Sequence, residues 1–250
     1  MDVIIIGKNM SFRKVVVDIE TVPCADALRP FIPQPRPSPQ PPFWRRWFKR
    51  RTTSADESYL QTALNWTLGR IVCIGLLVEC DDRPAEEQAF IAPIQPGDSL
   101  AASLQKEAEA LRQFWEFVHP DDYFIGHNIL GFDLPFLWNR SVVCGVCPSR
   151  PLYLQRESSR FTFDTMQIWA HWASTPSSRQ FVKLDTLAQV MGLQAKTGSG
   201  SQVYVWWREQ QFEKIRSYCL NDVRLEYDLY RRITLQESAP VLQWNHCDNR

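Results

Sequence analysis

Three short acidic segments recur along the chain, each at the edge of an apolar run. The first, Asp18-Ile19-Glu20, ends the run Val15-Val16-Val17. The second, Asn128 to Asp133, leads into another apolar run, and the third, Tyr218 to Asp222, lies in a helical pattern near the carboxyl end. A carboxylate beside a buried segment is costly unless a cation or hydrogen-bond donors compensate it. We therefore expect the fold to gather these side chains around compensating charge.

The hydrophobic periodicity predicts strands early in the chain and helices that alternate with them and then follow them. Short β-branched and apolar runs indicate strands, whereas apolar residues three and four apart indicate amphipathic helices. This order is typical of an α/β domain in which helices flank a mixed sheet. The predicted strands cover residues 13–18, 69–78, 88–92, 123–126 and 161–163; the predicted helices cover residues 100–118, 134–144, 165–172, 185–191 and 212–233, the last with a break near Leu220; residues 194–202 are predicted as a loop.

The composition limits where the protein acts and how it binds a polyanion. Its 250 residues carry 28 basic and 28 acidic side chains, so the net charge of zero gives no general attraction to nucleic acid. No apolar run approaches the ~20 residues that span a bilayer, and residues 1–6 lack the basic start of a signal peptide. Seven scattered cysteines, an odd number, favour free thiols in a reducing cytoplasm.

A Pro-rich, basic insert interrupts the pattern at about residues 30–54. Seven prolines lie between Pro30 and Pro42, and five cations and four aromatic rings follow in residues 43–51. Prolines at this density favour an extended, poorly packed chain. Three interpretations stay open: a solvated linker, a surface where rings stack on bases and cations contact phosphates, and a docking segment for a repair or replication protein.

The first two acidic segments carry the residue types of a site for hard cations. Asp18 and Glu20 are two residues apart on or just past a predicted strand, so their side chains can point to one face. Adjacent carboxylates repel each other unless cations lie between them, and oxygen ligands at this density suit Mg²⁺ or Mn²⁺. Asp133 lies within an apolar stretch, where it could bind such a cation, cap the following helix, or do both.

The third segment adds a phenol. Tyr218 and Asp222 are four residues apart, so on a helix one lies above the other. The phenol could orient or deprotonate a water molecule while the carboxylate completes the cation site; the alternative is a surface pair on an amphipathic helix. Four carboxylates and one phenol in this order favour a two-metal phosphodiester hydrolase, a nuclease.

The three segments resemble the motifs of the DnaQ-like, or DEDD, 3′→5′ exonucleases, which have a ribonuclease H-like fold. Tyr218-x-x-x-Asp222 stands where another branch of that group has a histidine, which indicates the tyrosine (DEDDy) variant. The run from Gly126 to Leu137 is similar to the proofreading domain of family B DNA polymerases. Residues 196–203 and the Tyr-Cys-x-x-Asp-Val run at 218–223 resemble stand-alone bacterial proteins described as predicted exonucleases related to that domain.

The resemblance implies a single exonuclease domain over residues 1–250, built on a central mixed five-stranded sheet. It covers residues 14–24 and 69–235 but leaves out the insert at about residues 30–54. It also implies that four carboxylates hold two divalent ions, Mg²⁺ or Mn²⁺, and that Tyr218 positions the attacking water. The implied metal ligands are Asp18, Glu20, Asp133 and Asp222. The implied substrate contacts are Thr21, Asn128 and Phe132.

The resemblance further implies a substrate with unpaired ends. A buried site of this kind admits a few unstacked nucleotides, so we expect hydrolysis of single-stranded or frayed DNA 3′ ends to nucleoside monophosphates. Similarity to polymerase proofreading favours DNA, but the tyrosine group also includes ribonuclease D-type RNA exonucleases, so RNA is the alternative. A further alternative is a nucleic-acid-binding scaffold that retains the fold; all five functional positions are filled here, which argues against it.

Overall fold

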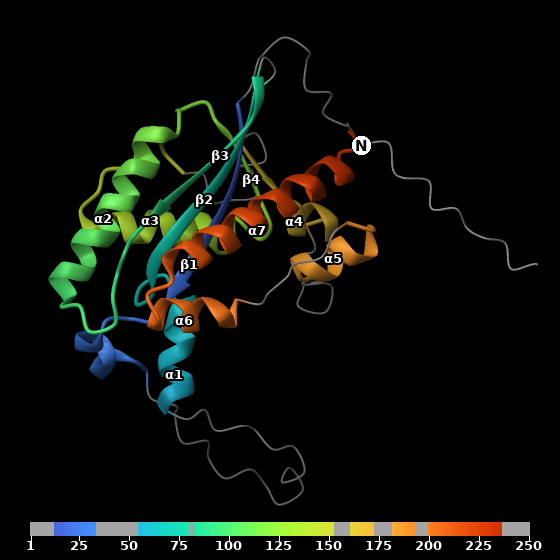
Figure 1. Ribbon diagram of the computed structural model, residues 1–250. Helices are drawn as coiled ribbons and strands as arrows, with labels where there is room; N and C mark the ends of the chain where they lie inside the picture. The colour runs from blue at the N-terminus through green and yellow to red at the C-terminus, as the bar shows by residue number, and fades with distance from the viewer. Residues whose placement is uncertain are drawn as a thin grey trace, which may run out of the picture.

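The computed structural model describes residues 13–33, 55–80, 83–152, 161–172, 182–193 and 200–236. Within them, five strands form one sheet in the order β3-β2-β1-β4-β5 (Figure 1). The strands are β1 (Lys14–Val22), β2 (Arg70–Cys80), β3 (Arg83–Ile91), β4 (Tyr123–Gly126) and β5 (Thr162–Asp164). The opening residues 1–6 and most of the Pro-rich insert, including residues 43–51, lie outside the described residues.

The central strand is β1, and it mixes the two kinds of pairing. It pairs antiparallel with β2 and parallel with β4. The sheet then extends by an antiparallel β3 beside β2 and a parallel β5 beside β4. This five-stranded mixed sheet with helices on its faces is the ribonuclease H-like α/β fold, which confirms the predicted fold class.

Long helices cover both faces of the sheet (Figure 1). On one face, Val16 of β1 packs in a buried cluster with Tyr230 of the last helix. Val15 points to the other face, as does its β4 partner Phe124, whose ring stacks on Phe114 with centroids 6.4 Å apart. The alternation along β1 therefore assigns one face to α7 and the other to α2 with its neighbour α3. These helices are α2 (Leu100–Phe117), α3 (Asp133–Cys144) and α7 (Phe212–Ile233).

Shorter helices surround the end of β1 and the last helix. Several of them were not predicted, because single-turn helices have weak periodicity in the sequence. They are η1 (Asp26–Phe31), α1 (Ala55–Gln61), η3 (Thr62–Leu64), α4 (Thr165–Trp169), α5 (Leu184–Val190) and α6 (Ser201–Arg208).

Three predicted boundaries are wrong, and tertiary packing explains each. The loop predicted to reach residue 202 gives way at Ser201 to α6, which is held where the Trp207 indole donates a hydrogen bond to the Ile94 carbonyl (2.8 Å). The break predicted near Leu220 is absent, because this residue packs against the cluster under α7. β3 begins at Arg83 rather than near residue 88; it is an edge strand, where Pro84 is tolerated.

A buried ion pair joins α2, α3 and β2. The Arg140 guanidinium donates to both carboxylate oxygens of Glu107 (2.8 and 2.7 Å), and the Ile71 amide donates to the same carboxylate (2.9 Å). The exposed fractions of the two charged side chains are 2% and 0%. A deeply buried charge strongly destabilises the fold if its partner is removed. This pair therefore fixes the positions of α2 and α3 on the sheet.

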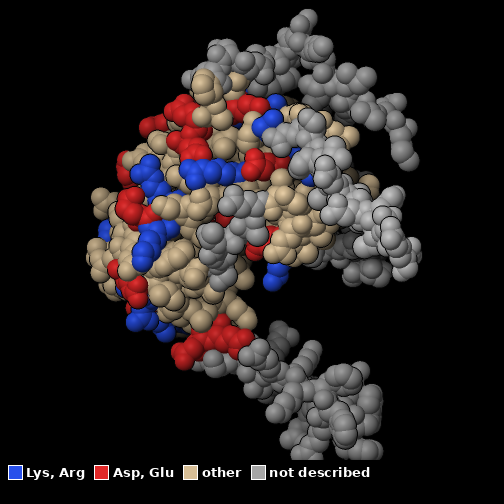
Figure 2. Space-filling model, turned by 45° about the vertical axis from the view of Figure 1, so that its right-hand side comes forward, with Lys and Arg blue, Asp and Glu red and all other residues tan. Residues whose placement is uncertain are grey.

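The surface carries both signs of charge. Figure 2 shows acidic and basic side chains interspersed on the face it displays, in keeping with the net charge of zero. None of the described helices has the length and apolar character required to cross a membrane.

Candidate functional site

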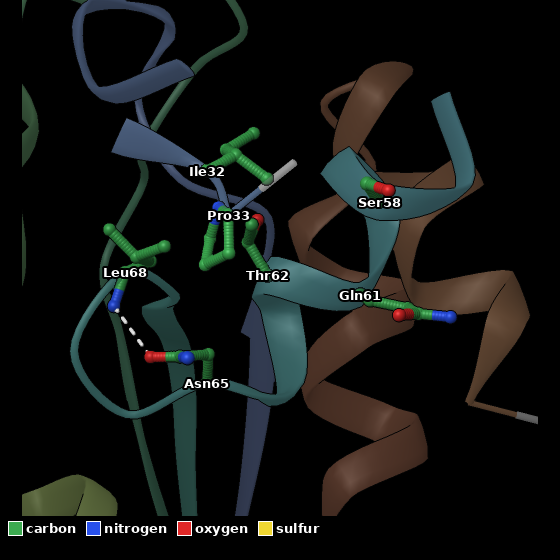
Figure 3. Close-up of a pocket in the computed structure, with 7 residues that line it drawn as sticks. All are labelled: Ile32, Pro33, Ser58, Gln61, Thr62, Asn65 and Leu68. Atoms are coloured by element: carbon green, nitrogen blue, oxygen red, sulfur yellow. Dashed lines mark hydrogen bonds between the residues drawn. The ribbon is translucent and has the colours of Figure 1, made fainter. Parts of the chain in front are cut away.

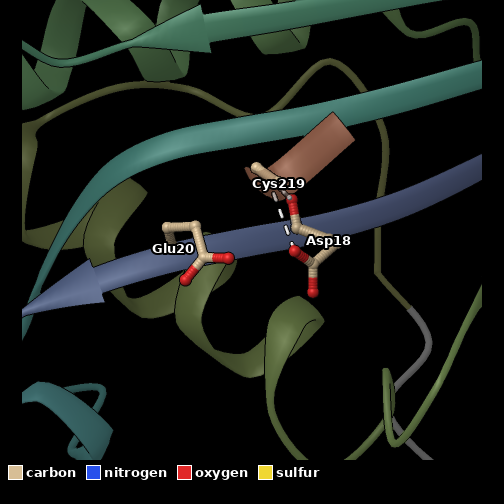
Figure 4. A group of neighbouring side chains, drawn as sticks. All are labelled: Asp18, Glu20 and Cys219. Atoms are coloured by element: carbon tan, nitrogen blue, oxygen red, sulfur yellow. Dashed lines mark hydrogen bonds between the residues drawn. The ribbon is translucent and has the colours of Figure 1, made fainter. Parts of the chain in front are cut away.

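The centre of the site is the acidic pair on β1. Asp18 and Glu20 alternate with buried apolar residues, so they share the face of Val16, the face that α7 covers. Figure 4 shows the two carboxylates side by side with the Cys219 thiol of α7 above them. Oxygens of the two carboxylates and the Cys219 sulfur all lie within 4.8 Å of one another. Glu20 is buried and Asp18 is half-buried.

Cys219 is a site residue that the sequence analysis did not identify. Its thiol donates to the main-chain oxygen of Asp18 and to its Oδ2, with sulfur–oxygen distances of 3.5 Å each. Gly75, the β2 partner of Asp18, leaves room for it: a Cβ there would lie 2.6 Å from the Cys219 sulfur. The signal in the sequence was its position three residues before Asp222, which places both side chains on one helix face.

Asp133 reaches the same strand from the start of α3. Its Oδ1 accepts a hydrogen bond from the Ile19 amide of β1 (3.2 Å). Burial, and then the nearby Asp18 carboxylate, raise the pKa of Asp133 well above its ordinary value. Of the roles left open for Asp133, the helix cap is ruled out: Phe132 occupies the N-cap position, and no side-chain cap is formed there. The carboxylate instead ties the second acidic segment to the first.

Tyr218 and Asp222 are both buried in the middle of α7, so the alternative of a surface pair on an amphipathic helix is ruled out. The Tyr218 ring meets the Trp206 ring of α6 edge-on, with centroids 5.7 Å apart. Asp222 shares the helix face of Cys219, whose thiol contacts Asp18. The helix thus presents a phenol, a thiol and a carboxylate along the face that packs on β1.

A buried carboxylate on the neighbouring strand shapes the loop before Asp133. Asp164 is the N-cap of α4 and accepts hydrogen bonds from the amides of Met166 and Gln167 (3.1 and 3.0 Å). It also accepts the amides of Asn128 and Leu130 (3.1 Å each), which lie in the loop. Burial raises the pKa of Asp164, whereas the hydrogen bonds from the amides of Gln167, Leu130 and Asn128 act to lower it. This carboxylate therefore holds the second acidic segment against β5.

The three expected substrate contacts occupy different environments. The Asn128 backbone is left-handed (φ 62°), and its side chain lies over Gly131, where a Cβ would be 2.4 Å from the Asn128 Oδ1. Phe132 is half-buried and packs against Phe136, with ring centroids 4.9 Å apart. The Thr21 hydroxyl donates to the Ala63 carbonyl (2.7 Å). Thr21 follows Glu20 directly on β1, and Phe132 directly precedes Asp133.

A separate pocket of about 260 Å³ lies between η1, α1 and η3 (Figure 3). Among the described residues, no ionisable side chain lines it, so it offers no acid–base pair. Its lining residues are Ile32, Pro33, Ser58, Gln61, Thr62, Asn65 and Leu68. The clustered carboxylates lie around β1 and not in this pocket.

Comparisons with known proteins agree with the resemblance noted in the sequence. A family model described as a predicted 3′-5′ exonuclease related to the exonuclease domain of PolB matches residues 61–240. No curated protein sequence matches the chain.

Solved structures with a similar arrangement include three of exonuclease I. The E. coli enzyme in complex with a 5cy-dT13 oligonucleotide has a TM-score of 0.46 and 10% identity over 91% of this chain and 41% of that one. The zinc ion bound form of its complex with single-stranded DNA has a TM-score of 0.41 and 12% identity, over 88% of this chain and 43% of that one. An apo form has a TM-score of 0.41 and 12% identity, over 92% of this chain and 48% of that one. This chain thus spans less than half the length of these structures.

Proposed function

Because the chain belongs to the family of predicted 3′-5′ exonucleases related to the exonuclease domain of PolB, we propose that it shortens single-stranded or frayed DNA from the 3′ end and releases nucleoside monophosphates. One observation carries this proposal: the carboxylates of Asp18 and Glu20 meet on β1, Asp133 is bonded to the same strand, and α7 packs over them. Carboxylates gathered from separate elements are what metal-assisted phosphodiester hydrolysis requires.

Asp18, Glu20, Asp133 and Asp222 are the proposed ligands of two divalent ions, Mg²⁺ or Mn²⁺. When bound, such ions stabilise negative charge on the attacking and leaving oxygens of the phosphodiester. The donor set fits hard cations, because it offers carboxylate oxygens. The raised pKa of Asp133, caused by burial and then by Asp18, reflects a cost that a bound cation would offset.

Tyr218 is the proposed group that positions the attacking water. Its ring is held edge-on against Trp206 and is buried within α7, which limits the directions its hydroxyl can take. A hydroxyl both donates and accepts hydrogen bonds, so it can hold a water molecule without a change of its own charge. Asp133 is held in one orientation by the Ile19 amide, which keeps the opposing side of the site ordered.

The substrate end is proposed to lie against Phe132, Asn128 and Thr21. The half-buried Phe132 ring offers a face on which a terminal base can stack, a contact that tolerates any base. The Thr21 hydroxyl already donates to Ala63, so its lone pairs are left to accept a hydrogen bond from the terminal sugar. Stacking and backbone contacts of this kind need an unpaired strand.

Two further assignments complete the proposal. The chain is treated as one exonuclease domain over residues 1–250, because the described elements share a single sheet. DNA is favoured over RNA through the relation to PolB, and RNA remains the second candidate, since discrimination rests on contacts to the 2′-hydroxyl.

Residues 43–51 are proposed either to capture substrate or to dock a repair or replication protein. If they capture substrate, deletion of residues 34–54 should lower turnover on naked oligonucleotides. If they dock a protein, the same deletion should leave that turnover unchanged.

The test is hydrolysis of matched DNA and RNA oligonucleotides, labelled at the 5′ end and supplied with Mg²⁺ or Mn²⁺. Asp18→Asn should lower the rate by on the order of 10³, because a ligand worth several kcal/mol in the transition state is removed. Asp121→Asn is the control, since this carboxylate is exposed in the turn before β4. Equal rates for the two variants, or DNA binding by the unmutated chain without any cleavage, would favour the scaffold alternative.

A further inference from the structure

The proposed cation site contains a sulfur atom. Cys219 lies on α7 with 0% of its surface exposed, and its thiol points at Oδ2 of Asp18 across 3.5 Å. The Glu20 carboxylate completes a group of three ligand atoms that lie within 4.8 Å of one another (Figure 4). These side chains come from β1 and α7, the two elements that enclose the proposed site.

The spacing of these atoms fits a tetrahedral ion with mixed ligands. Zinc binds a cysteine sulfur at about 2.3 Å and a carboxylate oxygen at about 2.1 Å, so tetrahedral angles place the two ligand atoms about 3.6 Å apart. The observed separation between the Cys219 sulfur and the Asp18 Oδ2 is 3.5 Å. All three ligand atoms of the group, including the Glu20 oxygen, lie within 4.8 Å of one another.

Hard ions such as Mg²⁺ and thiophilic ions such as Zn²⁺ differ in which of these ligands they prefer. Mg²⁺ takes oxygen ligands in octahedral geometry and gains little from sulfur, whereas Zn²⁺ and Cd²⁺ bind thiolates strongly. We propose that Asp18, Glu20 and Cys219 form a site for a thiophilic divalent ion, and that Zn²⁺ bound there blocks the exonuclease by excluding the catalytic ions. The inhibition, though not the binding, rests on the function proposed above.

The binding step is balanced without any oxidant or reductant. The Cys219 S–H bond breaks, a sulfur–metal bond forms, and the proton passes to solvent. The hydrogen that the thiol now directs at Asp18 would thereby give way to the metal ion, which Cys219 and Asp18 would both hold. Gly75 is part of the arrangement, because a side chain there would collide with the sulfur.

The neighbouring thiol provides the matched control. Cys73 is also fully buried and pairs with Glu20 across β1 and β2, so it lies on the same face of the sheet. It does not belong to the group of ligand atoms found among the described residues. The Cys73 side chain interacts with that of Cys219. Cys73→Ser therefore removes a buried thiol in contact with the site, keeps a hydrogen-bonding group beside Cys219, and leaves the three proposed ligands in place.

The experiment titrates the full-length protein with Cd²⁺ and follows thiolate-to-metal charge-transfer absorption in the ultraviolet. The unmutated chain and Cys73→Ser should both show the absorption, whereas Cys219→Ser and Asp18→Asn should lose it, with Cd²⁺ affinity weakened at least about tenfold. Cys219→Ala serves as the second variant, and thermal melting checks that each variant is folded. Absence of the band in the unmutated chain, or its persistence in both Cys219 variants, would overturn the site.

Zinc inhibition of Mg²⁺-supported cleavage is then measured, with each variant compared to its own rate without zinc. The zinc concentration for half-inhibition should rise at least about tenfold in Cys219→Ser and stay unchanged in Cys73→Ser. If the chain binds Cd²⁺ through Cys219 but cleaves nothing, the proposed function fails while the cation site stands. If it cleaves DNA and zinc inhibits all variants equally, the inference fails and the function stands.

Discussion

The buried Tyr218 side chain can serve in packing, through its ring, and in catalysis, through its hydroxyl. A substitution at this position can distinguish the two roles. Phenylalanine at this position keeps the ring against Trp206 and removes only the hydroxyl. We expect Tyr218→Phe to lower kcat by on the order of 10² while KM and the melting temperature change little, because the water is no longer oriented. Tyr204→Phe, on the neighbouring α6, is the control. Steady-state kinetics on a single-stranded oligonucleotide decide it, and an unchanged kcat for Tyr218→Phe would remove the tyrosine from the mechanism.

Part of the candidate site could be predicted from the sequence, residue by residue. The positions of Asp18 and Glu20 on one face followed from strand periodicity alone, since alternate residues of a strand share a face. The contact of Cys219 with Asp18 and the hydrogen bond from Ile19 to Asp133 could not be predicted, because each joins segments more than a hundred residues apart. No local pattern encodes which buried thiol or amide will meet a given carboxylate.

At the scale of elements, the buried pair between Glu107 and Arg140 should carry much of the packing of α2 and α3 on the sheet. Glu107→Ala leaves the buried Arg140 charge without its partner, so we expect a loss of about 3–5 kcal/mol in the free energy of unfolding. Glu109→Ala, two residues along the same helix, breaks an exposed pair with Arg112 and should cost less than about 1 kcal/mol. Urea denaturation measures both, and equal losses would contradict the role assigned to the buried pair.

The elements themselves were predicted to different degrees. β4 and α2 follow strong apolar patterns and were predicted almost to their ends. α6 was not predicted, because its position depends on the bond from Trp207 to Ile94 and on burial of Val203 rather than on local propensity. The extension of β1 past Glu20 depends on a register shift against β2, which strand propensity does not reveal.

At the scale of the whole molecule, the strand order explains why segments so distant in sequence form one site. β1 is central, β4 lies beside it and leads into α3, and α7 crosses the face that carries Asp18 and Glu20. The three acidic segments therefore meet around a single strand. Their order in the sequence suggested this fold only through resemblance to a known family, because periodicity gives element types but not which strands are neighbours. With no net charge, capture of a polyanion depends on local groups.

The most direct test of the central claim is anomalous diffraction from crystals of the full-length protein grown with Mn²⁺ and a nucleoside 5′-monophosphate. We expect two anomalous peaks roughly 4 Å apart, coordinated by Asp18, Glu20, Asp133 and Asp222. The same data from Asp18→Asn crystals should lose at least one peak. Manganese absent from these carboxylates in the unmutated protein, or bound only elsewhere, would contradict the account.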